Sequence, residues 1–226
     1  MRVLAIDTAL ASCSVAIFDS DASRILASQS LQMTRGHAEA LMPLVERVMA
    51  EAGTSFGGID RVAVTTGPGS FTGLRVGIAA ARAIALAAEK PAVGVTTLAA
   101  YAAPYQAEGR FPTIAAIDAR HDHVYFQVFA PGGRPSGEPR LAPLREAAEA
   151  AAAAPARLVG SAAEAIAAAL SDNEVKPVSV EPRLAPDIAW VARLGAISAE
   201  NASPPVPQYL RAPDAQPQYA AQLPRR

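Results

Sequence analysis

A glycine-rich stretch between two apolar segments contains the residues of this chain that are best suited to bind an anion. It runs Thr66-Gly-Pro-Gly-Ser-Phe-Thr-Gly-Leu-Arg-Val-Gly77 and predicts a turn from a strand into a helix. Gly67 and Gly69 allow backbone conformations that a side chain would penalise, and Ser70 or Thr72 can cap the helix. Free amides at a helix start, together with the helix dipole, can hold a phosphate or a carboxylate. The chemistry that this stretch predicts is therefore anion binding.

The common nucleotide motifs do not match this stretch. A P-loop requires a lysine and a hydroxyl residue after its last glycine, but Gly73 is followed by Leu74 and Arg75. The dinucleotide fingerprint also fails, because Thr72 stands where its third glycine belongs. A second interpretation therefore stays open, in which the glycines form a tight turn that lets the helix pack closely.

The first predicted strand ends in Asp7-Thr8, which is a second place for a contact with an anion or a metal. Several phosphate-handling folds place a carboxylate at this position. Asp7 could equally cap the turn by accepting hydrogen bonds from nearby amides. The candidate residues for an anion or nucleotide contact are Asp7, Thr8, Gly67, Gly69 and Ser70.

The histidines of the chain are weak candidates for a metal site. His37 and Glu39 lie two residues apart in a predicted helix, so they do not share a face, and a capping or hydrogen-bonded role for His37 is the alternative. His121 and His123 would point the same way in an extended segment, but no third ligand is apparent. We therefore expect no metal, no cofactor and no catalytic residue.

Composition limits the classes of protein to which the chain can belong. Its 226 residues are 51% apolar, which is enough for a sizeable core in one large domain or two small ones. The formal net charge of −1 argues against a broad nucleic-acid footprint. Cys13 is the single cysteine, which excludes an intrachain disulfide and fits a reducing cytoplasm. The opening, 1–7, lacks the features of a signal peptide, and we expect no membrane segment.

Hydrophobic periodicity predicts the elements that position these residues. The first half reads as three strands, a helix, a strand, a helix and a strand, followed by a helix that begins at Thr96. Their ranges are 3–6, 13–18, 24–32, 36–52, 59–65, 73–88 and 92–95. Polar residues and prolines interrupt the pattern at 104–112, so we expect a boundary there.

The second half restarts with a strand at Thr113 and carries shorter, alanine-rich helices. We expect strands at 113–117, 124–129, 157–159 and 178–180, helices at 144–154, 162–170 and 187–200, and a loop at 131–143. Asp187 is the predicted N-cap of the last helix. The proline-rich tail from Ser203 should be extended or loose.

This order of elements predicts an α/β fold with two lobes. A β-β-β-α-β-α-β unit followed by a second, reduced unit matches the actin-like, Hsp70 and sugar-kinase class of folds. We expect a first lobe at 1–108, a smaller lobe at 109–186 and an extended tail at 201–226. The helix at 187–200 could pack back on the first lobe.

Two predicted helices, 36–52 and 73–88, carry more apolar surface than one sheet face can cover. The residues that we expect to contact a partner are His37, Leu41, Val45 and Val48 on the first, and Gly73, Gly77, Ala80, Ala81 and Ile84 on the second. The small residues could let the second helix pack on the chain's own sheet or against a partner's helix. Large exposed apolar patches usually mark interaction sites, so we expect a partner.

Five stretches of the chain together resemble one protein family, nearly end to end. They are Leu4–Thr8, Arg35–Glu39 with Leu41, Gly67–Gly77, Asp118–Arg120 with Val124-Tyr125, and Pro207–Arg211. With these, the sequence resembles the TsaB (YeaZ) family of bacterial tRNA threonylcarbamoyladenosine biosynthesis proteins. Gly67–Gly77 is the most specific of the motifs. His123 departs from the family pattern, which has an acidic residue before Val-Tyr.

The resemblance implies an actin-like fold and a role without catalysis. Members of this family support TsaD, a paralogue that transfers a threonylcarbamoyl group from an adenylate to an adenosine beside the tRNA anticodon. TsaE, an ATPase subunit, completes the system. The resemblance therefore implies contact with TsaD through helices 36–52 and 73–88, a homodimer when the chain is alone, and only an indirect contact with tRNA.

The residues themselves agree with a subunit that lacks a catalytic metal. TsaD-like proteins carry a metal motif, His-x-x-x-His, after the strand that ends in Gly-Val. In this sequence Thr97 and Tyr101 stand at those two positions, and neither is a good ligand for iron or zinc.

Two rival classes of function stay open. One is a small actin-fold ATPase or a peptidase that acts on its own, although Ser12 and Ser70 have no convincing histidine and acid partners. The other is a purely structural homodimer, which the small-residue helix would serve as well as it serves a heteromer.

Overall fold

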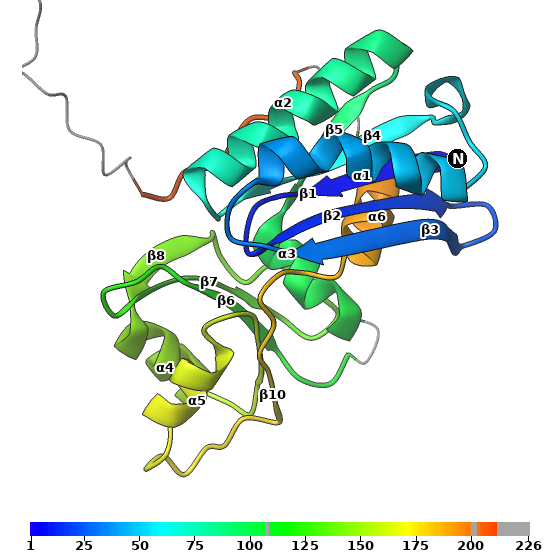
Figure 1. The fold of residues 1–226 in the computed structure, drawn as a ribbon. Coiled ribbons are helices and arrows are strands. Elements are labelled where there is room, and N and C mark those ends of the chain that lie inside the picture. Colours follow the sequence, from blue (N-terminus) through cyan, green and yellow to red (C-terminus); the bar gives the residue numbers. More distant parts are fainter. Residues whose placement is uncertain (107–108, 200–202, 212–226) are drawn as a thin grey trace, which may run out of the picture.

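The computed structural model describes residues 1–106, 109–199 and 203–211. These residues form two five-stranded sheets, one from each half of the chain, and each sheet has helices packed on it. Figure 1 shows the result as two lobes, with the sheet of the first half above and that of the second half below. The chain is therefore an α/β protein with the two-lobed, actin-like architecture that the order of elements predicts.

The first sheet has the strand order β3-β2-β1-β4-β5. Its strands are β1 (Arg2–Asp7), β2 (Ser12–Asp19), β3 (Arg24–Gln32), β4 (Arg61–Gly67) and β5 (Ala92–Thr96). β1, β2 and β3 pair antiparallel, whereas β4 and β5 run parallel to β1. The antiparallel hairpins need only short turns, while each parallel pairing requires a crossover helix.

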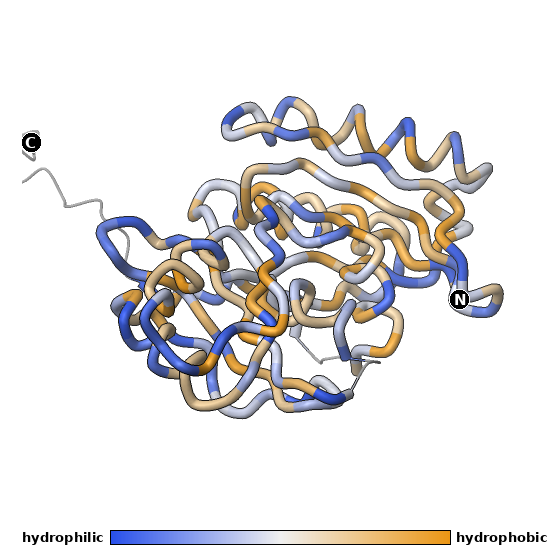
Figure 2. The backbone as a smooth tube through the Cα atoms, turned by 90° about the horizontal axis from the view of Figure 1, so that it is seen from below, coloured by the Kyte–Doolittle hydropathy of each residue, from blue (hydrophilic) through white to orange (hydrophobic). Residues whose placement is uncertain are grey.

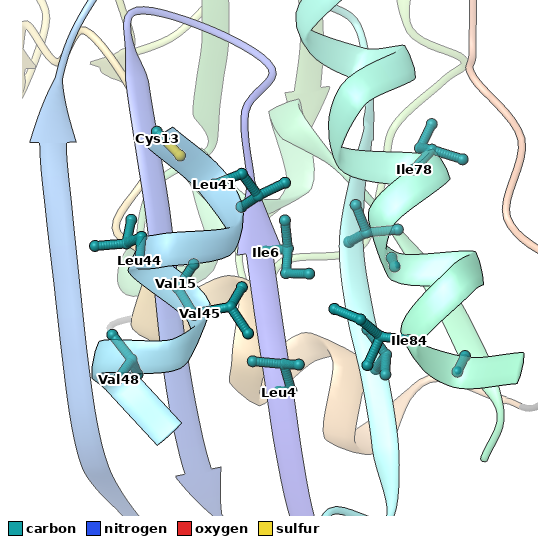
Figure 3. Close-up of a cluster of buried hydrophobic side chains, with 14 of the residues drawn as sticks. Leu4, Ile6, Cys13, Val15, Leu41, Leu44, Val45, Val48, Ile78 and Ile84 are labelled. Carbon is teal, nitrogen blue, oxygen red and sulfur yellow. The ribbon is translucent and has the colours of Figure 1, made fainter. Parts of the chain in front are cut away.

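Two helices cover one face of this sheet, and a third covers part of the other. α1 (His37–Glu51) and α2 (Phe71–Ala88) pack on Leu4 and Ile6 of β1, as Figure 3 shows. On the opposite face α6 (Ile188–Ile197) packs on Val3 and Ala5. Because successive side chains of a strand point to opposite faces, β1 must be apolar at consecutive positions to serve both layers.

The second lobe repeats the element order of the first. Its sheet is ordered β8-β7-β6-β9-β10, and each strand takes the place of its counterpart in β3-β2-β1-β4-β5. The strands are β6 (Thr113–Asp118), β7 (His123–Phe129), β8 (Arg140–Pro143), β9 (Arg157–Val159) and β10 (Ser179–Glu181). Helices α4 (Leu144–Ala152) and α5 (Ala163–Ala169) pack on one face. The second lobe keeps the five strands and the two helices on one sheet face, but both helices and four of the five strands are shorter than their counterparts in the first lobe.

A short helix connects the cores of the two lobes. α3 (Thr97–Ala102) contributes Ala100 to the core of the first sheet. Its Leu98 and Tyr101 pack instead with Ile117 and Phe129 of the second sheet. Short 3-10 turns lie at Phe56–Gly58 and Ala103–Tyr105. Figure 2 shows hydrophobic colour running through the middle of the molecule, with hydrophilic stretches mainly at the outer loops.

One expectation about regular elements is wrong. β8 lies within 131–143, where we expected only a loop, because Arg140–Pro143 gains its hydrogen bonds from the edge of β7, and local sequence does not reveal that pairing. The segment between β6 and β7 is a turn, in which Arg120, His121 and Asp122 all have left-handed backbone angles, so His121 and His123 do not lie on an extended segment.

The described part of the tail, 203–211, forms no helix or strand, and its first residues are not loose. Gln208 donates its amide proton to the carbonyl oxygen of Thr66 at 2.7 Å, and Pro205 is buried. The rest of the predicted tail, 212–226, lies outside the described residues. We keep the division of the chain into lobes at 1–108 and 109–186 as a proposal, which the positions of the two sheets support.

One helix among the described residues, α2, is long and apolar enough to cross a membrane by length and composition alone. It lies on the first sheet, with Leu74 and Ile78 packed in the core, as the core helix of a globular lobe would.

Candidate functional site

A cavity of about 460 Å³ lies between the lobes and is lined by parts of the predicted motifs. We call it the interlobe cleft. Its walls come from the β1–β2 turn, the start of α1, the glycine turn, the β6–β7 turn and the tail. The lining residues that matter here are His37, Gly69, Ser70, Phe71, Asp118, Arg120, Tyr125, Gln208, Tyr209 and Arg211. The cleft therefore joins segments that are distant in the sequence.

The glycine turn packs tightly against the turn after β1. A Cβ atom at Gly69 would lie 2.4 Å from the carbonyl oxygen of Ala9, and that oxygen accepts a hydrogen bond from the amide of Ser70 at 2.7 Å. Ser70 is the N-cap of α2, because its hydroxyl accepts from the amide of Gly73 at 3.3 Å. These contacts account for the glycines by close packing, which is the second interpretation of the motif. The anion contact remains an untested expectation.

Asp7 is fully buried beneath this turn. Its Oδ1 accepts from the amide of Ala9 at 2.9 Å and from the hydroxyl of Thr65 at 2.6 Å, while its Oδ2 has no partner among the described residues. Burial raises the pKa of the Asp7 carboxyl above its ordinary value. Neither Asp7 nor Thr8 is among the described residues that line the interlobe cleft. Asp7 therefore acts as the turn cap that the sequence offered as its alternative role.

The two positions that hold metal-ligating histidines in TsaD-like proteins are closed by packing in this chain. Thr97 and Tyr101 are both buried. The hydroxyl of Tyr101 donates to the carbonyl oxygen of Arg183 at 2.9 Å, and burial raises the pKa of that hydroxyl far above its ordinary value. Tyr101 therefore serves the contact between α3 and the segment that precedes α6.

The histidines have structural contacts in the described part of the chain. A ring nitrogen of His37, Nε2, lies 3.0 Å from the carbonyl oxygen of Leu10, which matches a hydrogen-bonded role. Nδ1 of His123 lies 2.7 Å from the carbonyl oxygen of His121, within the β6–β7 turn. Across residues 1–106, 109–199 and 203–211, no group of three His, Cys, Asp or Glu side chains could hold a metal.

The residues that we expected at a partner contact mostly face the interior of this chain. His37, Leu41, Val45, Val48, Gly73, Gly77, Ala81 and Ile84 are buried, and Ala80 is half-buried. The reason is geometric. Gly77, for example, packs where a Cβ atom would lie 2.4 Å from the Thr8 hydroxyl, so the small residues let α2 approach β1 and β4. Any contact of these helices with a partner must therefore use their exposed neighbours.

The exposed sides of the same helices carry apolar residues that the sequence pattern did not single out. On α2, Ala79, Ala83, Leu86 and Ala87 are exposed at helical spacing, and Leu86 is 82% accessible. On α1, Met42 is 47% accessible. We call these five residues the outer face of α1 and α2, and Figure 1 shows that both helices lie on the same side of the first sheet.

Sequence reasoning missed Tyr209, which lines the cleft, and Arg75, which contacts Tyr209. Their only signal was the resemblance of Pro207–Arg211 and Gly67–Gly77 to family motifs. The Arg75 Nε donates to the Tyr209 hydroxyl at 3.0 Å, and the Tyr209 ring stacks on Phe71.

Comparison with known proteins identifies relatives over most of the chain. The family model for TsaD, tRNA N6-adenosine threonylcarbamoyltransferase, matches residues 24–181. The chain is 42% identical over 130 residues to the tRNA threonylcarbamoyladenosine biosynthesis protein TsaB of Escherichia coli, covering 57% of this chain and 55% of the relative. An uncharacterized protein of Mycobacterium tuberculosis is 34% identical over 95% of this chain and 94% of its own length.

The curated TsaB proteins are longer than the part that aligns. The chain spans about half the length of those it matches, 55% in Escherichia coli and 52% in Haemophilus influenzae.

Solved structures support the same grouping. The structure described as YeaZ from Pseudomonas aeruginosa has a TM-score of 0.77 and 30% identity, covering 92% of this chain and 99% of that one. A ROK hexokinase from Thermus thermophilus, at 16% identity and a TM-score of 0.51, covers 87% of this chain and 99% of its own, and shares the fold alone.

Proposed function

This chain belongs to the TsaB (YeaZ) family of tRNA threonylcarbamoyladenosine biosynthesis proteins, and we propose that it is a non-catalytic subunit. In this proposal it binds a TsaD-type transferase and supports the formation of N6-threonylcarbamoyladenosine beside the tRNA anticodon. TsaE joins the full complex, and tRNA contacts the transferase and reaches this chain only indirectly. The proposal implies a cytoplasmic protein.

The observation that carries the proposal is that Thr97 and Tyr101 of α3, which stand where TsaD-like proteins carry metal-binding histidines, are buried and cannot bind a metal. A divalent transition metal needs imidazole, thiolate or carboxylate ligands on one face, with an open position for substrate. Thr97 and Tyr101 supply none of these three ligand types, and both are buried. The Tyr101 hydroxyl is already hydrogen-bonded to the carbonyl oxygen of Arg183. A chain that keeps the fold of the transferase family without these ligands suits a supporting role.

The partner contact follows from the exposed apolar side of the first lobe. Ala79, Ala83, Leu86 and Ala87 form one stripe on α2, in which small side chains would let a partner's helix approach closely. Leu86, at 82% accessibility, would be buried by such a contact, which favours association by roughly 1.5–3 kcal/mol. We therefore propose that the outer face of α1 and α2 packs on the transferase, and that it pairs two copies when the transferase is absent.

An omission experiment tests the proposed role. The modification is reconstituted with purified transferase, TsaE, tRNA and the threonylcarbamoyl adenylate, and the modified adenosine is measured by mass spectrometry with and without this chain. We expect product to fall to background when the chain is left out. The chain alone should neither modify tRNA nor hydrolyse ATP. Equal product without it, or steady turnover by the chain alone, would contradict the proposal.

A further inference from the structure

The C-terminal segment Ser203–Arg211 crosses from the first lobe to the second, and we call it the strap. At its start Pro205 packs beside Gly94 of β5, where a Cβ atom on the glycine would lie 3.5 Å from the Pro205 Cβ. Further along, the Gln208 amide donates to the carbonyl oxygen of Thr66 at 2.7 Å. The strap therefore passes beside the middle of β5 and the end of β4, next to the glycine turn.

The first lobe has a backbone shape that accommodates the strap. Gly67 has a φ of 113°, which an L side chain rarely adopts, and a Cβ atom there would lie 2.9 Å from the carbonyl oxygen of Gln208. A side chain at position 67 would therefore both strain the backbone and push the strap away.

An aromatic and cationic cluster holds the middle of the strap. The rings of Tyr209 and Phe71 stack with their centroids 5.0 Å apart and 30° between their planes. Arg75 lies over the Phe71 ring, with 3.8 Å from its Cζ to the centroid, and its Nε donates to the Tyr209 hydroxyl at 3.0 Å. The stacking of Tyr209 on Phe71 and the hydrogen bond from Arg75 to Tyr209 are lost when the strap leaves, whereas the cation–π contact between Arg75 and Phe71 lies within α2 and stays.

The end of the strap reaches the second lobe. An Arg211 guanidinium nitrogen donates to the carbonyl oxygen of Ala119 at 3.4 Å, in the turn between β6 and β7. The last strap residues, from Gln208 to Arg211, form one wall of the interlobe cleft. The strap thus links the first turns of α2 to the second lobe on one side of the cleft.

We propose that Ser203–Arg211 is a latch, which fixes the orientation of the two lobes when docked and opens one wall of the interlobe cleft when released. The middle of the strap suits reversible docking because the aromatic cluster that holds it lies near solvent. Phe71 and Tyr209 keep 36% and 41% of their surface accessible. Segments with few buried contacts open at a lower free energy than the core. The latch stands on these contacts and does not depend on the proposed partner.

Hydrogen exchange of the full-length chain, without any partner, tests whether the cluster holds the strap. The reporter is the Gln208 amide, whose hydrogen bond to Thr66 protects it while the strap is docked. Tyr209→Ala should raise its exchange rate by about threefold to tenfold, the range that corresponds to one stacked aromatic pair. Tyr209→Phe, which keeps the ring and loses only the bond to Arg75, should raise it less.

The matched control is Phe56→Ala, which removes an equally exposed phenylalanine, 41% accessible, from a 3-10 turn of the same lobe. It should leave the Gln208 amide unchanged. Unchanged exchange in Tyr209→Ala would overturn the latch. So would an equal rise at the amides of β1 and β4, because the whole lobe would then have loosened.

A distance measurement tests the link between the lobes. Spin labels are placed on exposed positions at opposite ends, Ala22→Cys in the first lobe and Glu164→Cys on α5, while Cys13 is buried and stays unlabelled. Adding Tyr209→Ala should broaden the distribution of label distances, and adding Phe56→Ala should not. A distribution of unchanged width in the Tyr209→Ala background would show that the strap does not fix the lobes.

Discussion

The hydroxyl of Thr8 donates a hydrogen bond to the carbonyl oxygen of Gly73 at 2.7 Å, and a Cβ atom at Gly73 would lie 2.1 Å from the Thr8 carbonyl oxygen. The end of β1 and the first turn of α2 therefore meet backbone to backbone. This contact gives the last part of the glycine motif a structural cause, since only glycine leaves room for the strand. It also brings the buried Asp7, the neighbour of Thr8, under the start of the helix.

Gly73→Ala should destabilise the protein. Alanine in a helix interior ordinarily stabilises by about 0.5–1 kcal/mol relative to glycine. At this position the added methyl group meets a backbone oxygen that cannot rotate away, and overpacking of this kind costs about 1–3 kcal/mol. We expect a lower free energy of unfolding in urea. Gly137→Ala is the control, because a Cβ atom there meets nothing within 4 Å. A Gly73→Ala variant at least as stable as the wild type would contradict the packing account.

The pH dependence of stability should report the burial of Asp7. Its pKa is raised in the folded state, so the folded protein keeps a proton that the unfolded chain loses near its ordinary pKa of about 3.9. The wild type should therefore lose stability as pH rises from there to the raised pKa, by at most about 1.4 kcal/mol per pH unit.

Asp7→Asn removes this titration and keeps an oxygen for Thr65 and Ala9. The difference in the free energy of unfolding, variant minus wild type, should increase with pH over the same window and then level off. Urea titrations from acid to neutral pH measure it. A difference that stays constant across that range would show that Asp7 has no raised pKa.

Arg61 should be important for holding α6 on the first sheet. Its buried side chain donates to the carbonyl oxygens of Gly195, Ala196 and Ser198, at 2.9, 3.1 and 2.7 Å. A cation at a helix C-terminus satisfies carbonyl groups that have no partner within the helix and complements the helix dipole. Arg61→Met keeps most of the apolar stem, so loss of these bonds should dominate and cost about 2–4 kcal/mol.

Thermal unfolding measures the effect of Arg61→Met, with Arg24→Met as the control at an exposed arginine of β3. If both variants unfold at the wild-type temperature, the contact with α6 contributes little.

Local patterns in the sequence predict most of the fold. β1 to β5, α1 to α3 and α6 appear in the predicted order, because their apolar periodicity is strong. Ser70, Thr96 and Asp187 supply recognisable caps for α2, α3 and α6. β8 was missed because a four-residue strand among prolines gains its structure from its neighbour, β7. The turn between β6 and β7 contains three consecutive residues with left-handed backbone angles, which have no sequence signature without glycine.

The candidate site was harder to predict, because side-chain burial depends on tertiary packing. Leu41 and Val45 belong to a correctly predicted helical stripe, yet the stripe faces the chain's own sheet. The pattern cannot tell which apolar surface of an almost wholly apolar helix such as α2 is covered. The strap likewise depends on contacts between Tyr209, Phe71 and Arg75, of which Tyr209 is distant in sequence from the other two.

The proposed function requires that this chain bind the transferase through the outer face of α1 and α2. Ala83 is exposed on α2, so Ala83→Glu places a charge on that face without entering the core, whereas the buried Ala81 would not allow this separation. Ala165→Glu makes the same change at an exposed position of α5 in the second lobe and serves as the control.

The most direct test mixes each variant of this chain with the transferase. It measures the mass of the complex that forms and, by calorimetry, the Kd between the two proteins. We predict a heteromer for the wild type and for Ala165→Glu, and a Kd raised by roughly tenfold to a hundredfold for Ala83→Glu, because a charge buried without a partner weakens an interface. Circular dichroism should show all three proteins folded. Wild-type affinity in Ala83→Glu, or no heteromer with the wild type, would contradict the account.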